Sequence, residues 1–238
     1  MKERPILFSA AMVRALLNGT KTQTRRIAPI SDLNIKPHSD DLVTWNVRFT
    51  KPVKGVIGNH SGGKLSDLQA RSIIAAQFNP FGQPGDRLWV KETWRTAKSL
   101  DAKSPTAIGE MWIDAGYLKS WAPVAYEADG HRNSNWQGFE MGGDAEPGKV
   151  RVSIHMPRWA SRITLEITDV RVERLQDISA SDAKAEGVEQ FDPSATAGIP
   201  ACSAHRYAYE DLWKSINGPD SWNLNPCVWC ISFRRVES

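Results

Sequence analysis

A short apolar helix that ends at a glycine and passes directly into a polar segment constrains the fold of this chain most. Residues 9–18 combine a suitable N-cap, Ser9, with apolar residues at helical spacing, and Gly19 provides the helix end. Residues 20–27 are polar and β-branched, which is typical of a strand that leaves a helix and joins a sheet. The N-terminal region therefore predicts a helix followed by a strand.

The other regular elements are marked by helix caps and by alternation of apolar and polar side chains. Residues 163–175 alternate most clearly and predict a strand. Ser179 is a suitable N-cap for a following helix, and Gly187 ends it. The predicted elements after the first strand are helix 65–78, strand 88–94, strand 163–175, helix 179–186, helix 207–216 and strand 228–233.

Two stretches, residues 31–80 and 95–150, are rich in turn-forming residues, including Gly62-Gly63, and we interpret them as irregular insertions. Between them, strands separated by single helices favour an α+β fold, most simply a small closed β-barrel flanked by helices. We therefore expect one domain over residues 1–238 that carries two insertions.

Composition restricts the compartment more than the function. The 30 basic and 27 acidic residues give a formal charge of +3, which permits a local nucleic-acid surface without requiring one. Three cysteines are too few for a disulfide framework. The apolar run at residues 6–12 is too short to span a membrane. We expect an unprocessed cytoplasmic protein that does not enter a membrane.

The segment at residues 19–26 carries the residue types from which a catalytic site can be built. A hydroxyl such as that of Thr24 needs a base to take its proton, and a buried lysine such as Lys21 can serve as that base because burial disfavours its charged form. A strict strand would place the two on opposite faces, whereas an irregular turn would bring them together. A solvated basic edge is the alternative. Under either interpretation Arg25 and Arg26 suit phosphate.

The sequence resembles the ASCH superfamily, whose members share a PUA-like barrel and are associated with RNA. The resemblance rests on the polar segment and on Gly85-Asp86 before a strand, and it extends to a group of prophage-encoded ASCH proteins. The residues that carry it are ILFS at 6–9, TQTRR at 22–26, GDRLWV at 85–90, HMPR at 155–158, SING at 215–218, Trp222 and Asn225-Pro226.

One bacterial branch of this superfamily consists of amidohydrolases that remove the acetyl group of N4-acetylcytidine with a lysine, a threonine and a glutamate. Its Gly-x-Lys-x-x-Thr core matches Gly19, Lys21 and Thr24. The resemblance implies Thr24 as nucleophile or as polariser of the amide, and Lys21 as base. The branch's glutamate corresponds by spacing to Asp211, next to Glu210, so this chain has a shorter carboxylate there.

Glu92 is a second candidate for the carboxylate. In a strand over residues 88–94 it shares a face with Leu88, Val90 and Trp94, where an unpaired acid is costly to bury. A salt bridge at the barrel rim is the alternative. Trp89 lies on the other face of that strand and is a candidate for contact with a base or with RNA.

The loop before strand 163–175 is a candidate for RNA binding. Arg158 and Arg162 offer charge to phosphates, and Trp159 offers a ring on which a base can stack. A structural loop anchored by Trp159 is equally compatible with the sequence.

Cys202, His205, Cys227 and Cys230 give nominal zinc-ligand spacing. Residues three apart in a strand point to opposite faces, however, and similar phage proteins carry ordinary apolar residues at the last two positions, so we predict no metal site. Glycine-rich nucleotide loops are absent from the sequence, and we expect no cofactor.

Three functions remain open from the sequence. The first is an amidohydrolase acting on N4-acylated cytidine or a related modified nucleoside or RNA base. The second is a binding module for RNA or a modified base without chemistry, and the third is a ribonuclease. A structural role in a phage particle would not require a polar cleft. The expected partner is thus a nucleoside or RNA, and the oligomeric state is not predicted.

Overall fold

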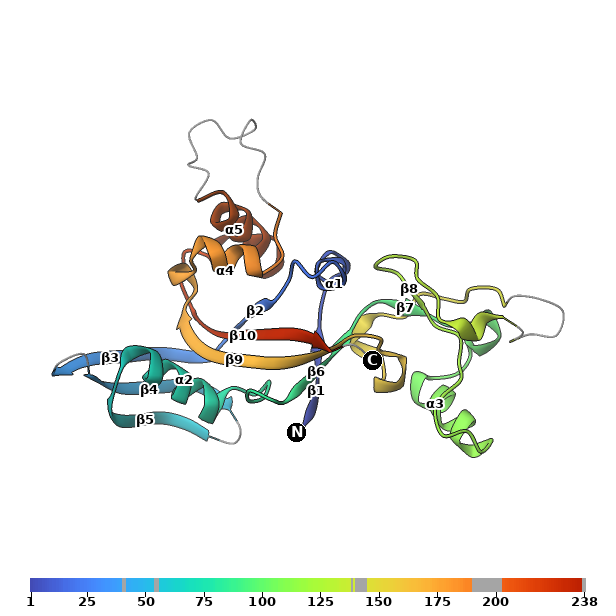
Figure 1. The fold of residues 1–238 in the computed structure, drawn as a ribbon, viewed down its shortest axis with the longest axis horizontal. Helices are drawn as coiled ribbons and strands as arrows, with labels where there is room; N and C mark the ends of the chain where they lie inside the picture. The colour runs from blue at the N-terminus through green and yellow to red at the C-terminus, as the bar shows by residue number, and fades with distance from the viewer. Residues whose placement is uncertain (40–41, 54–55, 138, 140–144, 190–202, 237–238) are drawn as a thin grey trace. The chain divides into compact units, whose positions relative to one another are not determined.

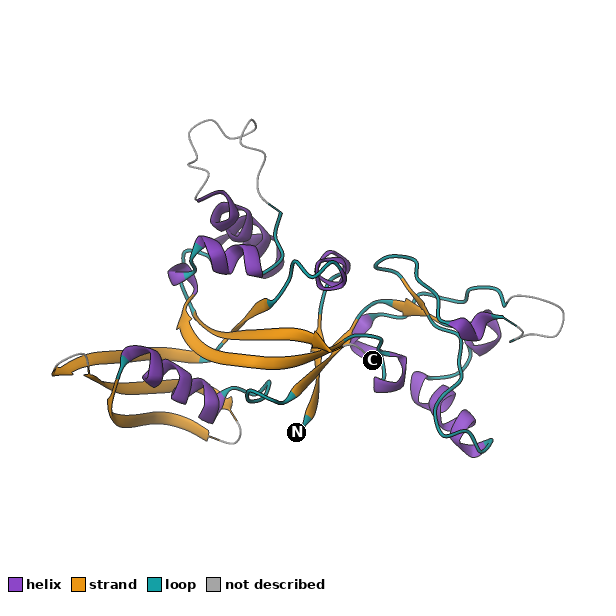
Figure 2. Cartoon of the chain, in the orientation of Figure 1, coloured by secondary structure: helices purple, strands orange, loops and turns teal. Residues whose placement is uncertain are grey.

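The computed structural model describes residues 1–39, 42–53, 56–137, 139, 145–189 and 203–236 (Figure 1). It contains both helices and strands, so the α+β class is confirmed (Figure 2). The chain divides into two compact units, which are described separately below. Unit 1 comprises residues 1–2, 19–87 and 166–234, and unit 2 comprises residues 3–18, 88–165 and 235–238.

A five-stranded mixed sheet has the strand order β1-β6-β9-β10-β2. Within the described residues the sheet is open, with β1 and β2 as its edges, and does not close into a barrel. The strand predicted at residues 88–94 is interrupted after Lys91. The strands of this sheet are β1 (Glu3–Leu7), β2 (Gln23–Ile27), β6 (Arg87–Lys91), β9 (Thr164–Arg174) and β10 (Cys227–Val236).

In unit 1, the helices α4 (Ala180–Ala185) and α5 (Ala204–Asn217) pack together, as Figure 1 shows. The N-cap predicted for α4 is confirmed, because the Ser179 hydroxyl accepts a hydrogen bond of 3.0 Å from the backbone N–H of Asp182. The helices and the ends of β9 and β10 share one apolar core. Its buried residues are Leu175, Ile178, Ala183, Tyr209, Trp213, Trp222, Val228 and Cys230.

Unit 1 also contains regular structure where an irregular insertion was predicted. The strands β3 (Ile30–Ser39), β4 (Leu42–Val53) and β5 (Val56–Leu65) form an antiparallel three-stranded sheet. Helix α2 (Asp67–Phe78) follows and confirms the predicted helix, with a capping box at Ser66. The prediction of an irregular stretch was therefore wrong for residues 30–65, which form this sheet, and the helix predicted at residues 65–78 is confirmed.

The glycine pair interpreted as a turn signal lies inside β5. Gly62 is paired with Trp45 of β4, and a Cβ atom at Gly62 would lie 2.3 Å from the indole ring of Trp45. Only a residue without a side chain permits this approach. The glycine therefore marks a close contact between strands.

Unit 2 contains α1 (Ala10–Leu17), α3 (Pro105–Asp114) and the short pair β7 (Trp94–Arg95) and β8 (Ala125–Tyr126). The predicted cap of α1 is confirmed, since the Ser9 hydroxyl accepts from Met12 N at 3.4 Å. Helix α3 lies in the second predicted insertion. It begins with a serine N-cap followed by proline, a start signal that could have predicted it.

Candidate functional site

The candidate site lies in unit 1, where the segment after Gly19 runs beside the end of α4. Gly19 has a φ of +74°, a conformation that favours glycine. The backbone N–H of Thr22 donates to the carbonyl of Ala185 at 2.8 Å, and Lys21 forms an isolated antiparallel bridge with Glu186. These main-chain contacts fix Lys21 next to the C-cap residue of α4.

Lys21 and Glu186 form a buried ion pair. The Lys21 Nζ donates to Oε2 of Glu186 at 2.8 Å and to the backbone carbonyl of the same residue at 2.7 Å. The two side chains are only 1% and 4% exposed. Burial lowers the pKa of Lys21, and the attraction of Glu186 opposes that effect without cancelling it. The Lys21 amine therefore becomes neutral at a lower pH than a lysine in water.

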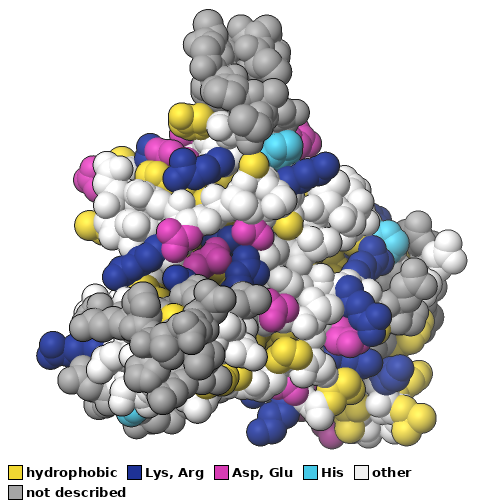
Figure 3. Space-filling view, turned by 60° about the vertical axis from the view of Figure 1, so that its left-hand side comes forward, with side chains coloured by type: hydrophobic (Ala, Val, Ile, Leu, Met, Phe, Trp, Pro, Cys, Tyr) yellow, Lys and Arg dark blue, Asp and Glu magenta, His cyan; other side chains and the backbone are white. Residues whose placement is uncertain are grey.

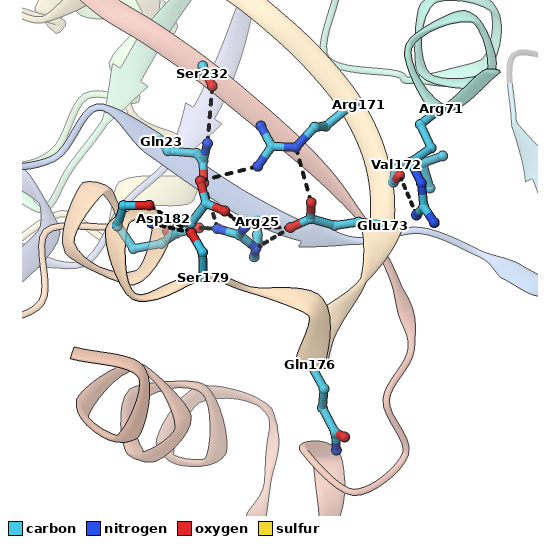
Figure 4. Close-up of polar contacts among 12 residues, drawn as sticks. Gln23, Arg25, Arg71, Arg171, Val172, Glu173, Gln176, Ser179, Asp182 and Ser232 are labelled. Carbon is cyan, nitrogen blue, oxygen red and sulfur yellow. Dashed lines mark hydrogen bonds and ion pairs between the residues drawn. The ribbon is translucent and has the colours of Figure 1, made fainter. Parts of the chain in front are cut away.

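Arg25 connects the Lys21–Glu186 pair to the carboxylates of Glu173 and Asp182 (Figure 4). Its Nη1 lies 3.2 Å from Oε1 of Glu186, so the two oxygens of Glu186 serve two different cations. Its Nε donates to Oε1 of Glu173 at 3.1 Å, and its Nη2 lies 3.4 Å from Oδ2 of Asp182. The Arg25 side chain is fully buried, and three carboxylates from β9 and α4 surround it.

The network approaches the surface through Arg171 of β9. Its Nε donates to Oε2 of Glu173 at 3.1 Å, and its Nη2 donates to Oδ1 of Asp182 at 3.2 Å (Figure 4). The Arg171 side chain is 16% exposed, whereas that of Arg25 is fully buried. Burial raises the pKa of the neighbouring Cys230 thiol well above its usual value. Side-chain exposure therefore decreases through the cluster, from the partly exposed Arg171 to the buried Lys21.

Thr24 is buried in β2, opposite Ile231 of β10. Successive strand residues point to opposite faces, so Thr24 faces away from Gln23 and Arg25, whose side chains hydrogen-bond to each other at 2.7 Å. The carboxylate shared by Lys21 and Arg25 lies on the Arg25 face. Lys21 and Thr24 thus belong to opposite sides of β2, as strict strand geometry predicts.

Arg26 is partly buried beside the same cluster. Its Nη1 donates to the backbone carbonyl of Arg25 at 3.4 Å. Burial lowers its pKa, opposed by the charge of Glu186. Of the two arginines predicted to suit phosphate, Arg25 is therefore paired with the protein's own carboxylates, and Arg26 donates to a backbone carbonyl.

Asp211, the carboxylate suggested by spacing, is exposed on α5. Tyr209 and Trp213 of the same helix are buried in the core, and Asp211 lies between them in sequence on the other side of the helix. Its neighbour Glu210 pairs with Lys214 at 2.5 Å. The carboxylate that contacts Lys21 is that of Glu186, at the helix end predicted from Gly187.

Glu92 belongs to unit 2 and has a partner there. Arg162 Nε and Nη2 each donate to one oxygen of Glu92 at 2.9 Å, and the same guanidinium bonds Asp129 at 2.9 Å. The Glu92 side chain is 2% exposed. Burial raises the pKa of Glu92, and the hydrogen bond from Arg162 opposes this. The arrangement matches the salt bridge weighed from sequence.

The remaining candidates for RNA contact also lie in unit 2. Trp89 is partly buried, with Lys91 Nζ 5.4 Å from its ring centre. Arg158 pairs with Glu3 at 2.8 Å. Trp159 is partly buried, packs edge-on against Trp94 with ring centres 5.6 Å apart, and donates to a backbone carbonyl. The ring of Trp159 thus contributes to the core of unit 2.

Of the nominal zinc ligands, Cys202 lies outside the described residues. Cys227 and Cys230 are buried thiols in β10 that form no disulfide among the described residues. Within the part of the chain that the structure describes, no group of three or more metal-binding side chains comes together.

Sequence reasoning missed Glu173, Asp182 and Glu186. Local sequence signals point to two of these residues, Glu173 and Glu186. Glu173 stands next to Val172 in a strand whose neighbouring residues are buried, and Glu186 directly precedes the glycine that ends α4. Neither signal identifies a partner, because the contacts join residues at least 148 positions apart.

No protein-family model matches this chain, and comparison with curated proteins and with solved structures also finds no match. Among the described helices, none has both the length and the apolar character needed to cross a membrane.

Proposed function

We propose that this chain is an amidohydrolase acting on N4-acylated cytidine or a related modified nucleoside or RNA base. The observation that supports it is the buried Lys21–Glu186 pair, because a lysine with a lowered pKa beside a carboxylate can take and return a proton. The resemblance to the ASCH amidohydrolases supplies the substrate class. In this proposal Glu186 takes the role that spacing alone gave to Asp211.

The reaction follows from these groups. The neutral Lys21 amine removes a proton from the attacking water molecule, because the Thr24 hydroxyl lies on the opposite face of β2. The carbonyl carbon gains the new C–O bond, and its bond to N4 breaks. Lys21 returns the proton to N4, and Glu186 orients the amine throughout. One water is consumed overall, and cytidine and the carboxylic acid are released.

The PUA-like architecture forms part of the same proposal. The antiparallel pair β2 and β10, with α4 and α5 beside it, brings residues from both ends of the chain to one buried polar cluster. A site formed in this way is compatible with a barrel-derived fold with helices at its side. Access for a base or nucleoside would require the surrounding side chains to separate, because Lys21 is 3% exposed.

The test is hydrolysis of N4-acetylcytidine by the purified protein, with cytidine release measured by chromatography. Lys21→Met and Glu186→Gln should each lower the rate by about 100-fold or more, the usual contribution of acid–base catalysis. Asp211→Asn is the matched control and should retain the wild-type rate, since Asp211 is exposed. Circular dichroism of each variant checks folding.

Thr24→Val gives a separate result. A nucleophilic or polarising hydroxyl predicts a loss similar to that of Lys21→Met, while a hydroxyl that faces away from the reaction predicts retained activity. Inactivity of the wild-type protein on several acylated cytidines, free and within oligonucleotides, would exclude the proposed reaction.

A binding module without chemistry is the second candidate. It is favoured by the charge balance of the cluster, in which Lys21 and Arg25 are already paired with three carboxylates. Figure 3 shows basic and acidic side chains interspersed on the face in view, which suits a partner recognised by shape as well as charge. RNA binding that weakens with salt and is unaffected by Thr24→Val would support this candidate. RNA cleavage retained by Lys21→Met would assign any nuclease activity to another site.

A further inference from the structure

We propose that Arg25 is a positioning residue that controls how readily Lys21 gives up its proton, acting through the carboxylate of Glu186 that the two cations share. The inference rests on the proposed function only in the use made of Lys21. It assigns a role to an arginine that the sequence had suggested for phosphate binding.

The geometry divides Glu186 between two donors. Lys21 contacts Oε2 at 2.8 Å, and Arg25 contacts Oε1 at 3.2 Å. An arginine remains charged at every accessible pH, so its hold on the carboxylate is permanent, whereas Lys21 can lose its charge. The charge that Arg25 neutralises on Glu186 is unavailable to stabilise the lysine ammonium. Arg25 thereby favours the neutral amine.

Glu173 determines how strongly the charge of Arg25 attracts the carboxylate of Glu186. It accepts from Arg25 Nε at 3.1 Å on the side away from Glu186 and balances part of the guanidinium charge. Burial acts to raise the pKa of Glu173, but the charges of Arg25 and Arg171 and a hydrogen bond from the Cys230 thiol outweigh it and lower the pKa, so Glu173 is ionised at neutral pH. Arg171 and Asp182 complete the surroundings of this pair. Lys21 therefore lies at the end of a series of alternating charges.

The charged and titratable groups near Lys21, among the described residues, influence how readily it loses its proton. Glu186 and Asp182 come from α4 and its C-cap, Tyr209 from α5, and Cys230 from β10. Besides Lys21, Arg25 and Glu186 themselves, the groups with charge interactions with one of these three are Arg26, Glu173, Asp182, Tyr209 and Cys230, and Arg171 acts on Glu173 and Asp182. Arg25 contacts both Glu186 and Glu173.

Two substitutions that remove charges of opposite sign test the proposal. Arg25→Gln should shift the titration of Lys21 to higher pH, because Glu186 then acts on the lysine alone. Glu173→Gln should shift it to lower pH, because the less balanced Arg25 draws more strongly on Glu186. The measurement is the 13Cε chemical shift of Lys21 in protein labelled with 13C-lysine, with the signal assigned by its loss in Lys21→Arg.

Opposite shifts separate this role from simple loss of packing. A loosened cluster admits water and raises the Lys21 pKa in both variants, since burial is what lowers it. Arg234→Gln is the control, because this arginine lies in the same unit, pairs with Glu166 and is 69% exposed. The control should leave the Lys21 titration unchanged.

The outcomes also distinguish this inference from the proposed function, because the NMR titration needs no substrate. Opposite shifts without hydrolysis of any acylated cytidine would support the role of Arg25 and remove the amidohydrolase. Hydrolysis with unchanged or parallel shifts in the two variants would overturn the role of Arg25 alone. If both hold, the acid limb of the hydrolysis pH profile should move in the same direction as the Lys21 titration.

Discussion

Replacing Arg162 by methionine should destabilise the protein strongly, and the loss should grow with pH. The substitution leaves Glu92, whose side chain is 2% exposed, without the two hydrogen bonds of 2.9 Å that Arg162 supplies. Removing one partner of a buried pair typically costs about 3–5 kcal/mol, because the remaining charge is uncompensated. The arginine also stacks on Tyr126, 4.0 Å from the ring centre, and pairs with Asp129.

The pH dependence follows from the direction of the Glu92 pKa. Burial raises it, and Arg162 opposes the increase, so the variant should have a still higher pKa in the folded state. The folded protein then binds a proton at pH values where the unfolded chain has released it. Stability consequently falls as pH rises from the ordinary glutamate pKa, about 4.3, toward the folded value. The variant should be closer to wild type at pH 5 than at pH 7.5.

Urea unfolding followed by tryptophan fluorescence measures this effect. A loss of about 3–5 kcal/mol corresponds to a decrease of about 1–2.5 M in the midpoint for a slope of about 2–3 kcal/mol per M. Arg234→Met is the matched control, because it breaks an arginine–glutamate pair that is 69% and 27% exposed and should cost under about 1 kcal/mol. Equal losses in the two variants, or a loss that does not change between pH 5 and 7.5, would refute the reasoning.

Two further predictions concern backbone strain and thiol burial. Gly19→Ala should lower the free energy of unfolding by about 1 kcal/mol, because φ is +74° there while the space around the position is open. Gly19→Asn should lower it by less in the same urea experiment. An unchanged unfolding midpoint for the alanine variant would contradict the assigned backbone conformation. In a Cys202→Ser background, Cys227 and Cys230 should react with a disulfide reagent only as fast as the protein unfolds, since both thiols are buried and burial raises the pKa of Cys230. Rapid reaction in native buffer would show that β10 is accessible.

Local signals predicted the helices α1, α2, α4 and α5 and four of the five strands of the large sheet, whereas α3 and β1 were missed. Ser9 and Ser179 cap helices as expected, and β9 follows the alternation read from residues 163–175. These features depend on neighbours within a few positions, which the sequence displays directly. The sheet formed by β3, β4 and β5 was missed because its glycines were interpreted as turns.

Alternation inside β4 could have revealed that sheet. Trp45, Val47 and Phe49 are buried, whereas the residues between them are exposed. The same two-residue alternation places the side chains of Thr24 and Arg25 on opposite faces of β2. It supports strict strand geometry over a turn that would bring Lys21 and Thr24 together.

Partners within the candidate site could not be predicted, for a different reason. Lys21 and Arg25 were identified as candidates, but the acids that contact them come from β9 and α4. Helix spacing directed attention to Asp211, which is exposed, and strand spacing to Glu92, which has its own arginine. Sequence patterns indicate which face a side chain occupies, and they do not specify which distant face it meets.

The contact between Lys21 and Glu186 joins residues 165 positions apart. Closing a chain of that length carries an entropic cost whose length-dependent part is about 4–5 kcal/mol, so we expect the contact to be absent from a fragment or an early folding intermediate. A peptide containing only the segment around Lys21 should therefore have a lysine with ordinary acidity. The titration of Lys21 would then report, at a single atom, that the two ends of the chain have come together.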